Sequence, residues 1–96
     1  MKTNEVINNK KIRAYDNGGK TLDRFTVVYL DCPENQHNTF FARGMSEDPF
    51  SPQGFGQGCS ATPGRHLGLR IEFSSLPKDC QKLILQDTSE VENENL

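Results

Sequence analysis

The thiol and imidazole side chains could do metal or covalent chemistry only if distant segments of the chain meet. Four residues separate Cys32 from His37, and six separate Cys59 from His66. Structural zinc sites use more closely spaced pairs, and a cysteine nucleophile needs an adjacent imidazole and an orienting third group. A zinc site gathered from loops stays a minor alternative. We expect no catalytic residue, no metal and no cofactor.

Two glycine-rich stretches could bind anions. Gly19-Lys20-Thr21 resembles the end of a phosphate-binding loop, but Ala14 stands where that motif needs its first glycine, and a strand follows instead of a helix. These glycines favour a tight turn. The segment Gly54–Gly58 (GFGQG) could instead form a concave run of backbone amides for a small anion or nucleotide. This is the alternative function that we carry forward.

The side chains that best suit recognition of a partner lie in a turn over residues 16–24 and a loop over residues 46–57. Phe50 and Phe55 would serve as apolar anchors, and the polar residues would set the orientation of the partner. The candidate binding residues are Asp16, Asn17, Lys20, Arg24, Glu47, Phe50, Gln53, Phe55 and Gln57.

An α+β fold must position these residues. Residues 11–15, 24–31, 39–43 and 69–73 read as strands of a small antiparallel sheet of about four strands. The strand at 24–31 is apolar on both faces, which predicts a central position. Leu69, Ile71 and Phe73 should point inward. The intervening stretch, 45–67, is rich in Gly and Pro and is expected to be a long ordered loop.

One C-terminal helix is expected over residues 74–87. Serines that can cap the helix and a proline suited to the first turn precede it. Leu76, Cys80, Leu83 and Ile84 recur at helical spacing and form one apolar stripe. This stripe should pack on one face of the sheet.

Composition allows a single domain. We expect it to span residues 11–87, with a disordered polar arm at 1–10 and a disordered acidic tail at 88–96. A net charge of −2 argues against nucleic-acid binding. The three cysteines are an odd number and no secretory signal is visible, so we expect reduced thiols, a cytoplasmic location and no membrane association. Self-association would help so small a core.

The segments IRAYDNGGKTLDRFT (12–26), MSEDPFSPQGFGQ (45–57) and LGLRIEFSSL (67–76) followed by Pro77 support a resemblance. The chain resembles a set of small uncharacterised bacterial proteins found on phage and other mobile elements. That set has a Tyr-Asp-Asn-Gly-Gly-Lys-Thr turn, a Ser-Glu-Asn-Pro-Phe type of loop and a late Leu-Pro before the helix. Asp48 replaces the asparagine of that loop here. The resemblance implies a habitat and no activity.

These observations predict a non-enzymatic binding protein. The hypothesis is a phage or mobile-element accessory protein that docks on a host or phage protein, in its most concrete form an inhibitor of a bacterial defence system.

Overall fold

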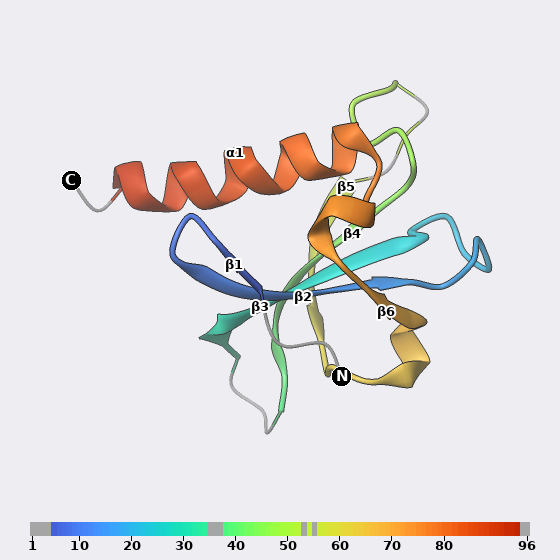
Figure 1. The fold of residues 1–96 in the computed structure, drawn as a ribbon, viewed down its shortest axis with the longest axis horizontal. Coiled ribbons are helices and arrows are strands. Elements are labelled where there is room, and N and C mark those ends of the chain that lie inside the picture. The colour runs from blue at the N-terminus through green and yellow to red at the C-terminus, as the bar shows by residue number, and fades with distance from the viewer. Residues whose placement is uncertain (1–4, 35–37, 53, 55, 95–96) are drawn as a thin grey trace.

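The computed structural model describes residues 5–34, 38–52, 54 and 56–94, with side chains described as far as Ser89. This part of the chain forms an antiparallel sheet and one α-helix (Figure 1). The elements are β1 (Glu5–Ile7), β2 (Lys10–Asp16), β3 (Phe25–Pro33), β4 (Phe40–Met45), β5 (Gly56–Ala61), β6 (Leu69–Ile71) and α1 (Lys78–Glu94). Two 3-10 turns, η1 (Arg65–Leu67) and η2 (Phe73–Ser75), flank β6. The α+β class is as predicted, but the sheet has more strands than expected.

The strands follow the order β1-β2-β3-β4-β5, and β6 pairs with β2. One edge of β2 carries both short strands, because Glu5 of β1 lies opposite Ile12 whereas Ile71 of β6 lies opposite Ala14. The other edge of β2 pairs with β3, with Ala14 opposite Val27. The last part of β2 therefore lies between β3 and β6, and this brings segments from three parts of the chain together at Asp16.

Strand β3 is in the middle of this order and is buried on both faces, as its sequence predicts. Phe25, Val27 and Tyr29 enter the core beneath α1. Val28 enters a second core on the opposite face, with Tyr15 of β2 and neighbours from β4 and η1. Apolar residues in consecutive positions are what a strand covered on both sides requires.

Helix α1 lies across one face of the sheet (Figure 1). Leu76, just before the helix, and Cys80 and Ile84 within it are buried against the sheet, which confirms the apolar stripe. Burial of a leucine or isoleucine side chain contributes roughly 1.5–3 kcal/mol. No helix in the described residues is both long and apolar enough to cross a membrane.

The ordered elements begin before residue 11, where the domain was expected to start. Asn8 and Asn9 have φ angles of 49° and 68° and connect β1 to β2 as a two-residue turn. Asparagine tolerates this left-handed region better than most residues do. The Asn8 amide also donates to the Thr88 hydroxyl at 2.8 Å, which ties the hairpin to α1.

The helix also continues past residue 87 into the segment 88–96, which was expected to be a disordered acidic tail. Thr88 is 2% exposed, and its hydroxyl bonds the Ile84 carbonyl at 3.0 Å while accepting the bond from Asn8. Thr88 follows Ile84 by four positions and therefore lies on the same face of α1 as the apolar stripe. Its hydroxyl is buried but has hydrogen-bond partners. Amino-acid composition alone does not indicate the bond between Asn8 and Thr88.

The expected loop at 45–67 contains a strand, β5, at the edge of the sheet. Gly58 of β5 lies opposite Arg43 of β4. A Cβ atom on Gly58 would lie 3.0 Å from the Phe41 ring, so the glycine leaves room for that ring. An edge strand tolerates glycine because it is paired and packed on one side only. The inward position expected for Leu69 is wrong, since its side chain is 78% exposed.

Candidate functional site

The connection between β2 and β3 is a turn built by its own side chains. The Asn17 amide oxygen accepts bonds from the backbone N–H groups of Gly19 (2.8 Å) and Lys20 (3.0 Å), and its NH₂ group donates to the Thr21 hydroxyl at 2.9 Å. Gly18 and Gly19 have φ angles of 79° and 89°, which other residues rarely adopt. The glycine pair and the asparagine thus fold this turn locally, as the sequence predicts.

Arg24 joins this turn to the loop that follows β4. Its guanidinium donates to both carboxylate oxygens of Asp16, at 2.8 and 3.1 Å, and to Glu47 at 2.5 Å. The bonds from Arg24 hold the pKa of Asp16 below its ordinary value, and Asp16 in turn raises the pKa of Arg24. Both groups therefore keep their charges. Bidentate pairing of this kind also restricts geometry.

The loop after β4 is held from within and from the helix. The Asp48 carbonyl accepts from the Ser51 N–H at 3.1 Å, and the Ser51 carbonyl accepts from the Gly54 N–H at 2.8 Å. The buried Cys80 thiol of α1 donates to the Ser46 carbonyl at 3.2 Å. Burial raises the pKa of Cys80 to about 11, so this thiol keeps its proton at neutral pH.

The turn and the loop enclose a first open hollow of about 680 Å³, called here the turn–loop hollow. Leu22 lines it and is 64% exposed. Phe50 lies between Asp48 and Ser51, which both line the hollow, and is 47% exposed. Its ring centroid lies 5.9 Å from the Lys82 ammonium of α1. Two exposed apolar side chains thus accompany this polar depression.

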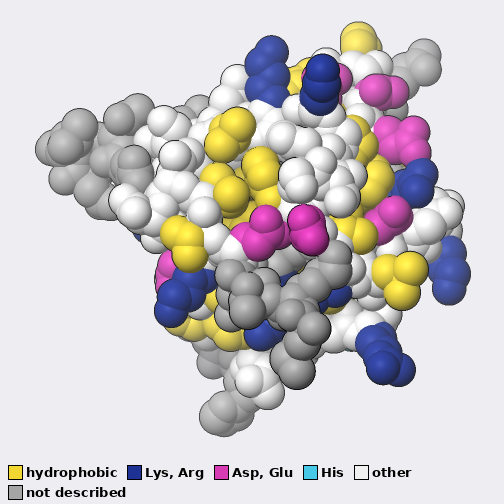
Figure 2. Space-filling model, in the orientation of Figure 1, with side chains coloured by type: hydrophobic (Ala, Val, Ile, Leu, Met, Phe, Trp, Pro, Cys, Tyr) yellow, Lys and Arg dark blue, Asp and Glu magenta, His cyan; other side chains and the backbone are white. Residues whose placement is uncertain are grey.

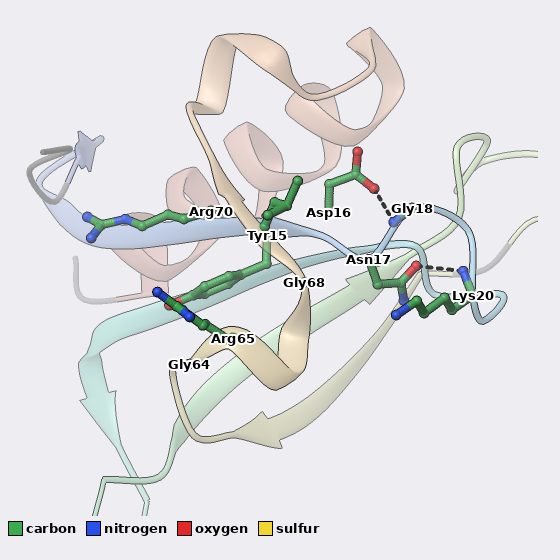
Figure 3. A pocket seen from close by; sticks show the side chains of 10 residues that line it. Tyr15, Asp16, Asn17, Gly18, Lys20, Gly64, Arg65, Gly68 and Arg70 are labelled. Atoms are coloured by element: carbon green, nitrogen blue, oxygen red, sulfur yellow. Dashed lines mark hydrogen bonds between the residues drawn. The ribbon is translucent and has the colours of Figure 1, made fainter.

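A second open hollow, of about 750 Å³, lies where the same turn meets the segment that leads into β6. We call it the basic hollow. Tyr15, Asp16 and Lys20 line it from the hairpin, and Arg65, Leu69 and Arg70 line it from the other segment. Figure 3 shows Lys20 on the turn side and Arg65 on the opposite side, with the backbone of Gly68 between them. Lys20 lines both hollows.

The structure brings together four of the expected binding residues, because Asp16, Asn17, Arg24 and Glu47 belong to one bonded unit. The Asn17 N–H donates to the Arg24 carbonyl at 2.9 Å and closes that unit. Gln57 is separate from it: it lies on β5, opposite Gly44. Gln53 and Phe55 lie outside the described residues.

From residue 56 onward, the glycine-rich segment 54–58 is extended strand and does not form the concave backbone that an anion cradle requires, while Phe55 lies outside the described residues. Gly56 and Gly58 are in the extended strand β5, paired with β4. Among the described residues, positive φ angles at glycine occur at Gly18, Gly19 and Gly68. Successive amides in an extended strand point to opposite sides, whereas a nest needs them to converge. The alternative anion site therefore lacks this part of its support.

A second ionic cluster, which was not predicted from the sequence, lies between the sheet and the helix. Asp87 accepts bonds from Arg43 at 2.6 and 3.1 Å and from the Tyr29 hydroxyl at 2.8 Å. Desolvation and the Asp87 carboxylate raise the pKa of Tyr29. Asp87 follows Cys80 by seven positions, on the buried face of the helix. In the sequence, the position of the Asp87 carboxylate in line with the apolar stripe is the signal that could have revealed this cluster.

The cysteine and histidine residues do not assemble into a recognisable centre within the described part of the chain. There, no group of three or more His, Cys, Asp or Glu side chains could hold a metal ion. Cys59 is exposed on β5, and desolvation and Asp23 raise its pKa, which disfavours the reactive thiolate. His37 lies outside the described residues.

No family model, no curated protein and no solved structure matches this chain. The resemblance to mobile-element proteins therefore stays a prediction. What the chain does has to be inferred from its own geometry.

Proposed function

We propose that this chain is a non-catalytic binding protein that docks on a partner protein through its turn–loop surface, formed by residues 17–24 and 46–52. One observation carries the proposal: Arg24 bonds Asp16 and Glu47 at once, so two segments far apart in the sequence share one arrangement. A surface arranged before binding loses less conformational entropy when its partner arrives. That is the main requirement for tight recognition by a small domain.

The exposed side chains of this surface suit a protein partner. Leu22 and Phe50 are 64% and 47% exposed and would enter apolar pockets on the partner. Lys20 and Asp48, of opposite charge, border the hollow and would set the orientation. Figure 2 shows hydrophobic side chains among lysine, arginine and acidic side chains on one face of the molecule. Such surfaces bind through a few anchors.

The setting of this function follows from the sequence resemblance. A small accessory protein of a phage or mobile element would act in the host cytoplasm, and its partner would be a host protein. Blocking a defence or regulatory protein requires only stable occupancy of that partner, and no chemistry. A docking surface that is held in place by its own bonds suits that role.

The proposal is tested by replacing each anchor with a charge. Leu22→Asp and Phe50→Asp are compared with Val6→Asp, a matched control, since Val6 is 58% exposed on β1. The wild-type chain, immobilised, captures its partner from host lysate, and the purified partner is then titrated against each variant. We expect both anchor variants to weaken binding at least about tenfold, as loss of an anchor does. Unchanged affinity of both anchor variants, or equal weakening by Val6→Asp, would contradict the proposal.

A further inference from the structure

Strand β5 (Gly56–Ala61) lies at one edge of the sheet and is exposed. In the strand order of the described residues it comes last, and its pairing with β4 runs over all 6 of its residues without a shift of register. Alternate residues of an antiparallel strand direct their backbone N–H and C=O groups to opposite sides. Half of these groups in β5 therefore point away from β4, and residues 56–60 are all exposed. Such an edge can pair with a further strand.

The β5 edge lacks the features that usually prevent such pairing. Charged side chains, proline, bulges and short length all protect natural edge strands from pairing with another chain. The β5 sequence, GQGCSA, contains no charged residue and no proline. The strands β1 and β6, at the edge of β2, have 3 residues each and contain Glu5 and Arg70. The two sides of the sheet therefore differ, and β5 is the long, uncharged edge.

We propose that β5 pairs with β5 of a second copy of this chain, antiparallel and about a two-fold axis, to form a dimer with one continuous sheet. An antiparallel edge is complementary to itself, so two copies related by such an axis use the same residues and form a closed dimer. Because β5 carries no charge, two chains of net charge −2 can meet there without placing like charges opposite each other. Self-association also stabilises a domain with a small core.

The packing around β5 favours Cys59 as the central residue of this pairing. A two-fold axis perpendicular to the sheet places the central residue opposite its own counterpart. The first residue of β5 is crowded, because a Cβ atom on Gly56 would lie 3.0 Å from Leu83 Cδ2 and 3.2 Å from Pro49 Cβ. Pairing centred on Cys59 uses residues 57–61 and leaves Gly56 outside the contact.

This register also leaves room for the Glu34 carboxylate at the edge. Glu34 is exposed and accepts a bond from the Ser60 hydroxyl of β5 at 2.9 Å. In the proposed dimer, Ser60 lies opposite Gly58 of the second copy, which has no side chain to meet that carboxylate. No residue of the turn–loop surface belongs to β5, so the dimer does not depend on docking and presents that surface twice.

Sedimentation velocity of the purified chain, in a reducing buffer that excludes a disulfide, measures the dimer Kd. Cys59→Lys places two ammonium groups opposite each other, and we expect it to raise this Kd at least about tenfold. Cys59→Glu should weaken the dimer in the same way. An equimolar mixture of the two variants places an ammonium opposite a carboxylate and should restore the dimer, which would also show that both variants are folded.

Val6→Lys is the matched control, because it adds the same charge at a 58% exposed position of β1. We expect its Kd to equal that of the wild type. A wild-type chain that stays monomeric as its concentration rises would overturn the dimer. An unchanged Kd in Cys59→Lys, or equal weakening by Val6→Lys, would overturn the contact at β5. A mixture that stays monomeric would overturn the pairing of residue 59 with itself.

Discussion

Among the described residues, the Arg43–Asp87 and Arg24–Asp16 pairs lie in different surroundings. Arg43 and Asp87 join the sheet to α1, and their side chains are 20% and 17% exposed. Arg24 and Asp16 lie at the base of the hairpin turn and are 35% and 23% exposed. In each pair, the arginine donates two bonds to one carboxylate.

The surroundings decide what each pair does. Tyr29 adds a third bond to Asp87, and the Tyr29 ring stacks on Phe41 with centroids 5.5 Å apart. The loss of one partner there leaves a desolvated charge, which is costly. Arg24 instead reaches the exposed Glu47, where water can replace a lost partner. The less exposed pair, Arg43 and Asp87, therefore holds the helix on the sheet, whereas the more exposed pair, Arg24 and Asp16, shapes the turn–loop surface.

Breaking the Arg43–Asp87 pair should produce the larger effect. Asp87→Asn removes the charge that faces Arg43, and we expect a loss of about 2–3 kcal/mol in the free energy of unfolding. Chemical denaturation measures this loss. Asp79→Asn is the control, an exposed acid in the first turn of the same helix, and its effect should stay below about 1 kcal/mol. Small losses of equal size for Asp87→Asn and Asp79→Asn would contradict the stabilising role of the Arg43–Asp87 pair.

Breaking the Arg24–Asp16 pair should destabilise the fold less, and the loss of stability should depend on pH. Asp16→Asn is expected to destabilise the fold by about 1 kcal/mol at neutral pH. The pKa of Asp16 is lowered in the folded state from its ordinary value of 3.8. Its stabilising contribution is therefore present above that value and is lost as the pH falls through the lowered folded pKa.

The measurement is the difference in unfolding free energy between wild type and Asp16→Asn across an acid titration. This difference should be constant from neutral pH down to the ordinary pKa and then shrink toward zero. If the difference in unfolding free energy instead grew as the pH fell, the pH dependence would have the opposite sign, and this would contradict a stabilising ion pair at Asp16.

The parts of the fold predicted from sequence are those with a strong local pattern. Consecutive apolar residues around Val28 identified the central strand, and the spacing of Cys80 and Ile84 identified the helix face. Gly18 and Gly19 identified the turn through the backbone angles that they permit. In each of these elements, the conformation that the local sequence favours is also the one that tertiary packing requires.

The parts that were missed depend on contacts between distant segments. β1 has only three residues, and its place depends on pairing with β2 and on the bond between Asn8 and Thr88, 80 residues apart. β5 contains glycines that disfavour an isolated strand, and its pairing with β4 overrides that preference. In the candidate site, the turn and the loop were expected, but Leu22 and the hollow beside Arg65 depend on how the segments pack.

The proposed docking surface requires that the hairpin turn has one conformation before any partner binds. Backbone ¹⁵N relaxation of the free protein tests it at the amides of Gly18, Gly19 and Lys20, with Asn17→Ala as the variant that removes their bonds. We expect order parameters near about 0.85 in the wild type, as in rigid backbone, and lower values in the variant. Values below about 0.6 in the wild type would mean a flexible turn and would contradict the account.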